Sequence, residues 1–143
     1  MAAAETKETQ ANAAPEGDLT LRTVAMPADT NPHGHIFGGW LMSLMDVAAG
    51  VAAGGIAKGR VATAAVSHLS FLEPVHVGDV VCCYTALRRI GRTSITMHVE
   101  AWVLRQNRAP RVKVTAAEFV MVAVDGQGRP RMVEAPADPA GEA

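Results

Sequence analysis

The sequence lacks the features on which a secreted or membrane-spanning protein depends. Its only two cysteines, Cys82 and Cys83, are adjacent in the chain. Adjacent residues do not reach the Cα separation of an ordinary disulfide, so a scaffold held by disulfide bonds is excluded and reduced thiols in the cytoplasm are expected. The longest apolar run, Val47 to Ala57, contains glycine and is far shorter than the ~20 residues that cross a bilayer. We therefore expect no membrane span.

An excess of charge of one sign is also missing. The 13 Lys and Arg residues balance 14 Asp and Glu residues, the net charge is -1, and like charges form no block. A nucleic-acid-binding protein normally carries an excess of Lys and Arg for the phosphates, so no nucleic-acid partner is expected. Glu5, Lys7 and Glu8 stand where a signal peptide needs apolar residues, and no export signal is expected.

Composition and periodicity place one folded domain between two arms. The chain has 143 residues, of which 49% are hydrophobic, and this length is typical of a single domain. Residues 1–17 and 133–143 are rich in Ala, Pro and Glu without periodicity. A disordered N-terminal arm and a disordered C-terminal tail are therefore expected. The single domain then comprises residues 18–132.

Alternating apolar and polar residues predict an antiparallel sheet. This period-two pattern marks strands over residues 19–26, 61–71, 80–90, 93–104 and 112–124. Residues 28–39 and 105–110 are predicted loops, residues 40–57 are the one predicted helix, and the last four strands are expected to form a meander. The expected fold class is therefore α+β, with a curved antiparallel sheet of about five strands wrapped around one long central helix.

The predicted helix has one apolar face and one face of small residues. At about 100° per residue, the apolar face that should press into the sheet consists of Leu41, Leu44, Met45, Ala48, Val51 and Ala52. The opposite face consists of Gly39, Ser43, Asp46, Gly50, Ala53 and Gly54. Small residues let a ligand or another backbone approach closely, and Asp46 is the only charge on this face. We expect a functional carboxylate; the alternative is one buried for a hydrogen bond at an interface.

Two glycines, Gly38 and Gly39, directly precede the predicted helix. They would leave N–H groups free at the positive end of the helix dipole, where an oxyanion or another anion binds, although a flexible entry to the helix is the alternative. Asp46 follows Gly39 by seven residues, or roughly 10 Å along a helix axis. One carboxylate therefore does not reach a reacting carbon held at its own helix start. If both groups act on one substrate, they come from two copies of the chain, and a homodimer is expected.

The stretch LRTVAMPADTNPHGHIFGGWLMSLMD, residues 21–46, resembles the signature of the YciA-type acyl-CoA thioesterases. The similarity continues in GRVATAAVSHLSFLEPVHVGDVVCCY (59–84), GRTSI (91–95) and FVMVAVD (119–125). The resemblance implies a hotdog fold, hydrolysis of acyl-CoA to a free acid and CoA, and no cofactor, since CoA is part of the substrate. It also implies active sites between paired subunits and a hexamer built as a trimer of dimers.

The resemblance also implies roles for individual residues. The catalytic group would comprise Asp46, Asn31, Gly38 and Gly39. The residues expected to bind CoA are Gly91, Arg92, Thr93, Ser94, Arg60 and Lys58, and those expected to line the acyl pocket are Met42, Met45, Leu69 and Phe71. The chain departs from the family pattern at His35, Ser67 and His68, which affects the expected acyl preference.

The implied mechanism is attack of water on the thioester, with Asp46 as general base; direct attack by Asp46 through an anhydride is the open variant. A hotdog hydratase would need a histidine beside the helix, and residues 36–57 contain none. An acyl-CoA sensor that binds without hydrolysis is the other alternative. His33 and His35 lack the spacing of known metal motifs, so no metal is expected, and the two cysteines are interpreted as packing residues.

Overall fold

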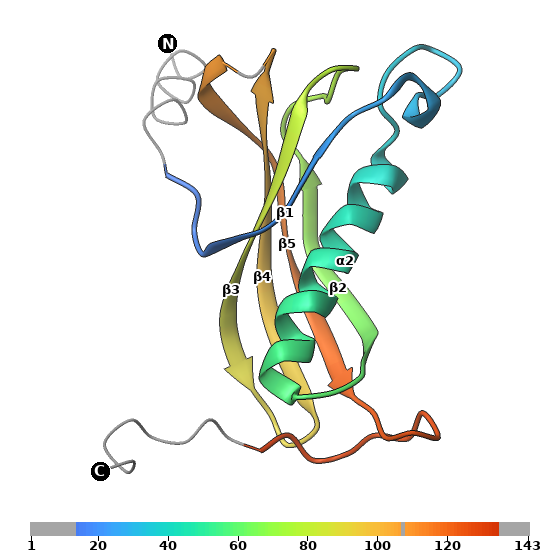
Figure 1. Ribbon diagram of the computed structural model, residues 1–143, viewed down its shortest axis with the longest axis vertical. Helices are drawn as coiled ribbons and strands as arrows, with labels where there is room; N and C mark the ends of the chain where they lie inside the picture. The colour runs from blue at the N-terminus through green and yellow to red at the C-terminus, as the bar shows by residue number, and fades with distance from the viewer. Residues whose placement is uncertain (1–13, 107, 135–143) are drawn as a thin grey trace.

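The computed structural model describes residues 14–134, apart from residue 107. Its elements in chain order are β1 (Asp18–Val24), the short 3-10 helix η1 (Pro27–Asp29), α2 (Gly38–Ala57), β2 (Val61–Phe71), β3 (Val80–Ile90), β4 (Ser94–Arg105) and β5 (Arg108–Ala123). The five strands form one antiparallel sheet in the order β1-β3-β4-β5-β2, and α2 lies against one face of it (Figure 1). The expected α+β class, with a sheet of five strands around one long helix, is confirmed.

The core lies between α2 and the sheet, as the strand patterns predict. In β4 the inward-facing residues Ile95, Met97, Val99, Ala101 and Val103 are at most 2% exposed. They pack in one cluster with the buried face of α2. Burial of one face of an antiparallel sheet gives this alternation from Ser94 to Val99, whereas Glu100 and Trp102 on the opposite face are buried as well.

The predicted four-strand meander is wrong in one strand. β3, β4 and β5 are consecutive neighbours, but β2 pairs with β5, from Val61 opposite Ala123 to Phe71 opposite Thr115. Alternation along a strand reports which face is buried and carries no information about the pairing partner. The last strand also begins at Arg108 instead of residue 112, because Arg105 and Arg108 already pair across a short turn. The predicted loop 105–110 is therefore mostly strand.

The helix differs from the prediction in its start and its buried face. It begins at Gly38, with Phe37 as the N-cap residue, so the two glycines form the first turn. Val51, predicted to face the sheet, is 61% exposed, whereas Ala49 and Ala53 are fully buried. Alanine lets the helix axis approach the sheet more closely than valine would. By length and composition alone α2 also resembles a membrane span, but its buried residues pack against the sheet in the core cluster.

The folded body extends slightly past the predicted boundaries. The backbone N–H of Glu16 donates to Glu100 Oε1 at 3.2 Å. The backbone N–H of Val133 donates to the carbonyl of Arg92 at 2.8 Å, and Val133 is 8% exposed. Both residues were assigned to the arms. The rest of the predicted arms, residues 1–13 and 135–143, lies outside the described residues.

Candidate active site

The first turn of α2 presents its N–H groups without a side-chain cap. Phe37, the N-cap residue, has extended backbone angles and contributes no side-chain hydrogen bond. Two aromatic rings lie close to this turn. A Cβ atom on Gly38 would be 3.0 Å from Cζ of Phe71, and one on Gly39 would be 2.8 Å from Cε2 of Phe37. A side chain at either position would displace one of these rings, and glycine also leaves the backbone amides open to an anionic oxygen.

Asp46 lies in the third turn of α2, on the side that faces β2. It is half-buried, and Oγ1 of Thr63 on β2 donates a hydrogen bond to its Oδ1 at 2.5 Å. A hollow of about 280 Å³ opens beside this pair. Its walls are formed by Gly39, Met42, Ser43, Asp46, Thr63, Val66 and Phe119. One carboxylate oxygen is thus held by a hydroxyl donor while the carboxylate borders a space large enough for water and part of a ligand.

Asn31 organises the loop that leads into the helix. Its Oδ1 accepts hydrogen bonds from the backbone N–H groups of His33 at 2.9 Å and His35 at 3.1 Å. The loop is joined to the helix entrance because the N–H of Phe37 donates to the carbonyl of Asp29 at 3.2 Å. The side-chain oxygen of Asn31 is therefore engaged within the loop, and its amide NH₂ group is the part that can donate to a substrate or water.

The residues expected to bind CoA come together at the opposite end of the molecule. The N–H of Ala123 donates to the carbonyl of Thr93, and the N–H of Val124 donates to that of Arg60, so the GRTS turn and the start of β2 flank the end of β5. Gly91 closes this turn: its N–H donates to the carbonyl of Ser94, and a Cβ atom there would lie 2.5 Å from Ser94 Oγ.

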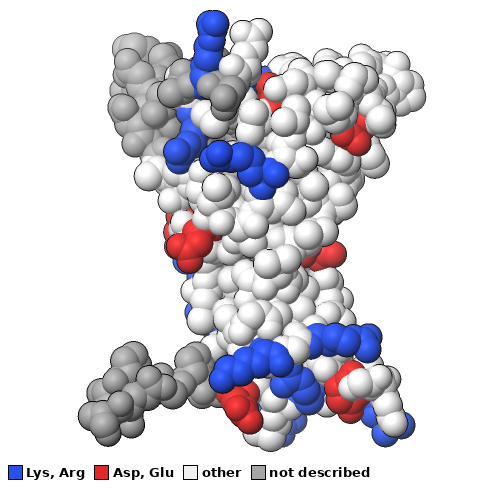
Figure 2. Space-filling model, viewed as in Figure 1, with Lys and Arg blue, Asp and Glu red and all other residues white. Residues whose placement is uncertain are grey.

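This end of the molecule is cationic. Lys58, Arg60 and Arg92 are exposed there. Figure 2 shows Lys and Arg side chains at the foot of the molecule, with Asp and Glu side chains among them, and a second group of Lys and Arg side chains near the top. Sequence reasoning missed two further members, Arg129 and Arg131, which follow β5. Arg131 Nη2 donates to the carbonyl of Ala57 at 2.6 Å and so neutralises the C-terminal end of the helix.

The predicted acyl-pocket residues do not lie together. Met45 is fully buried in the core, and Leu69 on β2 is partly buried against it. Met42 lines the hollow beside Asp46, whereas Phe71 lines a different cavity at the helix start. Thr63, the closest partner of Asp46, was not predicted because a threonine on an exposed strand carries no distinguishing pattern.

Within one chain the glycine turn and the cationic group lie far apart. α2 has 20 residues and spans about 30 Å, with its glycine turn at one end and the cationic group at the other. The outer edge of β2 pairs with no strand among the described residues, and β2 is exposed along most of its 11 residues. It carries no Lys, Arg, Asp or Glu, the residues that usually protect a free edge. This edge strand is therefore available to pair with another strand.

A second polar cluster lies on the face of the sheet away from α2. Glu100 is 4% exposed, and its carboxylate accepts hydrogen bonds from Trp102 Nε1 at 2.9 Å and from His98 Nε2 at 2.7 Å. Lys113 Nζ lies 3.4 Å from it. Burial raises the pKa of Glu100, but these donors and the backbone N–H of Glu16 outweigh burial and hold the pKa below its ordinary value.

This cluster could also be considered as a metal site. Among the described residues, it is the one group whose carboxylate and imidazole atoms lie close enough to one another to share a metal ion. The ligand atoms of Glu16, His98 and Glu100 lie within 4.8 Å of one another. Arg88 forms an ion pair with Glu16 through both carboxylate oxygens, and Lys113 approaches Glu100. The positively charged side chains of Arg88 and Lys113 already neutralise these carboxylates. The cluster is therefore a structural network of ion pairs.

The two cysteines are packing residues. Cys82 and Cys83 are free thiols with exposures of 1% and 0%. Burial raises the pKa of Cys83 to about 12, so this thiol is protonated at neutral pH and does not act as a nucleophile.

Residues 33–109 match the family model described as the thioesterase superfamily. The acyl-CoA thioester hydrolase YciA of Escherichia coli is 53% identical over 120 residues, which cover 82% of this chain and 91% of that protein. The crystal structure of the hexameric thioesterase y2039 from Yersinia pestis is 50% identical with a TM-score of 0.82, over 86% of this chain and 100% of that one. The hexameric hotdog-fold thioesterase Cj0915 of Campylobacter jejuni is 38% identical with a TM-score of 0.78, over 82% and 91% of the two chains.

Proposed function

The chain belongs to the thioesterase superfamily, and from this premise we propose that it hydrolyses acyl-CoA thioesters to a free carboxylic acid and CoA. One observation carries the proposal: the only carboxylate on α2, Asp46, is held by Thr63 at the border of a hollow beside the glycine turn. A lone carboxylate with an oriented oxygen fits a general base, and the open backbone amides of the glycine turn fit an oxyanion site.

Two copies of the chain complete the site. The edge of β2 that pairs with no described strand pairs with the same edge of a second copy around a two-fold axis, which continues the sheet and gives its backbone N–H and C=O groups hydrogen-bond partners. This pairing sets the two α2 helices side by side in opposite directions. The partner's Asp46 then faces the glycine turn of this chain, and the partner's cationic end lies toward the same turn. Three such dimers form the hexamer.

The reaction divides between these groups. The amides of Gly38 and Gly39 bind the thioester carbonyl oxygen, and Asn31 orients the attacking water. Asp46 takes a proton from this water while the oxygen of the water bonds to the carbonyl carbon. Collapse of the tetrahedral intermediate breaks the carbon–sulfur bond, and the departing CoA thiolate takes up a proton. Because Thr63 holds Oδ1, the other oxygen of Asp46 is the proton acceptor.

CoA is held through its phosphates by the cationic end. Lys58, Arg60 and Arg92 present exposed charges around the GRTS turn, as phosphate recognition requires. Hydrolysis consumes only water, so we propose that the enzyme uses no cofactor. The cytoplasmic location expected from its reduced cysteines belongs to the same proposal.

Thiol release from a panel of acyl-CoA substrates tests the function. The expected result is saturable release of CoA, which Asp46→Asn slows by about 10²- to 10⁴-fold. Saturable binding of acyl-CoA without thiol release would favour a sensor and overturn the proposal.

The shared site has its own test, in which two inactive variants are mixed. Asp46→Asn and Asn31→Ala are each expected to be inactive alone, because every site of either oligomer lacks one group. After the mixture is dissociated and reassembled, mixed dimers regain one intact site, and activity rises well above that of either variant. No recovery would place Asn31 and Asp46 of one site in the same chain.

A further inference from the structure

Two histidine rings meet beside the entrance to α2. His35 lies in the loop between η1 and α2, and His76 lies in the loop between β2 and β3. Their ring centroids are 6.2 Å apart and the ring planes meet at 66°, so the rings pack edge to face. Both residues are exposed, so burial in the core does not account for the contact. Neither ring takes part in the proposed reaction.

The loop that carries His76 is anchored to the sheet through Asp79, which is 4% exposed. Oδ2 of Asp79 accepts hydrogen bonds from the backbone N–H of His76 at 2.9 Å and from Nη1 of Arg105 on β4 at 3.2 Å. Nη2 of Arg105 also donates to the carbonyl of Pro74 at 3.0 Å. Charge-assisted hydrogen bonds of this kind are strong, so the ring of His76 is attached to a firmly held backbone.

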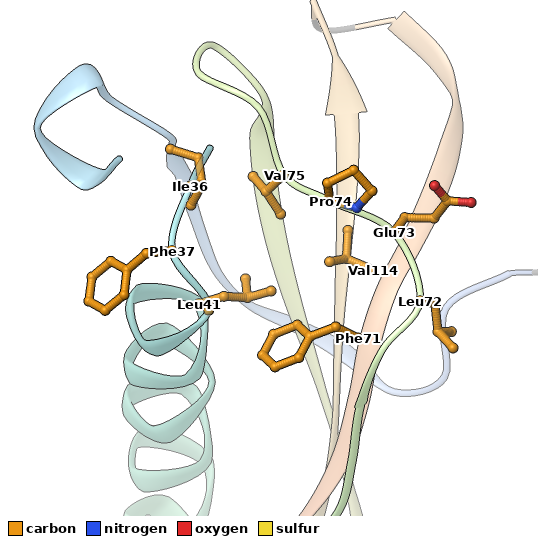
Figure 3. Close-up of a pocket in the computed structure, with 10 residues that line it drawn as sticks. Ile36, Phe37, Leu41, Phe71, Leu72, Glu73, Pro74, Val75 and Val114 are labelled. Carbon is orange, nitrogen blue, oxygen red and sulfur yellow. The ribbon is translucent and has the colours of Figure 1, made fainter. Parts of the chain in front are cut away.

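The loop before α2 is joined to this anchored loop at two neighbouring positions. The backbone N–H of Ile36 donates to the carbonyl of Val75 at 3.3 Å, and Figure 3 shows the two residues beside each other near the helix start. The ring pair of His35 and His76 lies one residue further along each loop. The preceding residue, Gly34, is exposed with a φ of +83°, and nothing lies within 4 Å of where its Cβ atom would be. The ring of His35 therefore connects an exposed turn to the body of the protein.

The backbone of His35 is bonded twice to Asn31. The N–H of Asn31 donates to the carbonyl of His35 at 2.7 Å, and the N–H of His35 donates to Oδ1 of Asn31 at 3.1 Å. A shift of His35 would therefore move both the backbone and the side chain of Asn31. We propose that His35 and His76, through their ring contact, position Asn31 for catalysis. The proposal rests on the proposed thioesterase function, in which Asn31 orients the attacking water.

This role differs from the effect on acyl preference that the resemblance implies for His35. A positioning residue changes the rate of the chemical step equally for every acyl chain, because the water and the thioester carbonyl are the same in all of them. A residue that contacts the acyl chain changes the rate in a way that depends on chain length. Kinetics with a series of substrates therefore separates the two roles.

The kinetic test measures kcat and KM with acyl-CoA substrates of several chain lengths. His76→Ala removes one ring, and we expect kcat to fall about two- to tenfold at every length, the range that one edge-to-face ring pair supplies, with KM unchanged. His76→Phe keeps a ring at this position and should recover most of the activity. Val77→Ala, at the next residue of the same loop and 45% exposed, is the matched control and should leave both constants unchanged.

A double variant and a spectroscopic measurement test whether the two rings act as one unit on Asn31. His35→Ala should match His76→Ala, and the double variant should be no slower than either, because each substitution removes the same contact. When asparagine is labelled with ¹⁵N, the side-chain amide of Asn31 is one of three in the chain. Its NMR signals should shift in His76→Ala and return toward their wild-type positions in His76→Phe.

The outcomes separate this proposal from the proposed function. An unchanged kcat in His76→Ala, or a His76→Phe variant that stays as slow, would overturn the proposal. A loss that varies with chain length would also overturn it and place His35 at the acyl chain. Circular dichroism checks folding, and an unfolded alanine variant would make the pair a purely structural contact, against the proposal. If the wild-type protein releases no CoA from any substrate, the thioesterase function fails, whereas the amide signals of Asn31 still decide whether the pair positions this residue.

Discussion

Thr63 on β2 donates a hydrogen bond of 2.5 Å to the carboxylate of Asp46 on α2. This contact joins the only charged residue of the central helix to the strand at the edge of the sheet. The same strand carries the unpaired edge through which a second copy would bind. Formation of the dimer and placement of the catalytic carboxylate therefore depend on one element, and β2 links assembly to activity.

The first prediction concerns Asp46 itself. Asp46→Asn keeps the size and shape of the side chain but removes the proton acceptor. We expect kcat to fall by about 10²- to 10⁴-fold, the range of general acid–base catalysis, with the affinity for CoA and the melting temperature nearly unchanged. Thiol release and calorimetric titration with CoA measure the two effects. Near-normal turnover would remove Asp46 from the mechanism.

The second prediction separates positioning from proton transfer. Thr63→Val removes the hydroxyl donor and preserves the shape of the side chain, so Asp46 loses its fixed orientation. A hydrogen bond to a charged group contributes about 1.5–3 kcal/mol, and we expect kcat to fall by about tenfold or more with little change in KM. Thr63→Ser restores the donor and should recover most of the activity. Equal losses in both variants would point to packing instead of the hydrogen bond.

Sequence patterns identified the elements better than their arrangement. The limits of β2 and β3 were predicted to the residue because the Gly and Pro residues that flank the two strands, Gly59, Pro74, Gly78 and Gly91, are local signals in the sequence. The strand that pairs with β2 was not predicted correctly, because the pairing of β2 with β5 joins residues far apart in the chain. On α2, hydrophobicity favoured Val51 for the core, although close packing against the sheet selects Ala49 and Ala53.

The site was predicted to a similar extent. Asp46 could be singled out because it is the only charge on a helix of small residues. Thr63 could not, since its role arises only when β2 folds back beside α2. Arg131 was missed for the same reason: its contact with the carbonyl of Ala57 joins residues distant in sequence. Contacts of this kind exist only in the folded chain.

The third prediction concerns the phosphates of CoA. Arg92 is exposed on the GRTS turn, and its backbone is held by a hydrogen bond from Val133, so truncation should not disturb the turn. We expect Arg92→Ala to raise KM for acyl-CoA by about tenfold, as loss of one charge-assisted hydrogen bond would. For the matching acyl-pantetheine, which lacks the nucleotide phosphates, KM should not change.

Arg111 provides the control for this variant. It is an exposed arginine near the start of β5, at the other end of the strand from the cationic group. Arg111→Ala should leave KM for both substrates unchanged. If KM for acyl-CoA rose equally in the two variants, the cause would be the overall electrostatic potential of the protein and not a contact with a phosphate.

The fourth prediction concerns the thiols. Burial raises the pKa of Cys83 to about 12, and both cysteines are nearly inaccessible. Since the thiolate is the reactive form, a disulfide reagent should modify neither cysteine of the native protein at pH 8 on the timescale of the activity assay. Both should react after denaturation in guanidinium. Rapid modification of the native protein would mean that this region of the sheet opens readily.

The last prediction concerns stability in acid. The pKa of Glu100 is lower in the folded protein than its ordinary value, despite the opposing effect of burial, because His98, Trp102 and Glu16 donate to the carboxylate. A lowered pKa stabilises the fold above the unfolded-state value, about 4.3, and this stabilisation is lost as the pH falls through the folded-state value. Glu100→Gln should therefore lower the melting temperature by about 5 °C at pH 7, and the difference should narrow below about pH 4.

Glu118 serves as the control for this experiment. It lies on β5, directly opposite His98 in the strand register, and its side chain is 35% exposed with a single ion pair of 3.6 Å to Arg88. An exposed pair of this kind contributes little to stability, so Glu118→Gln should leave the melting temperature nearly unchanged at both pH values. If the two variants behaved alike, the bonds around Glu100 would contribute no more than ordinary surface charges, although Glu100 is 4% exposed.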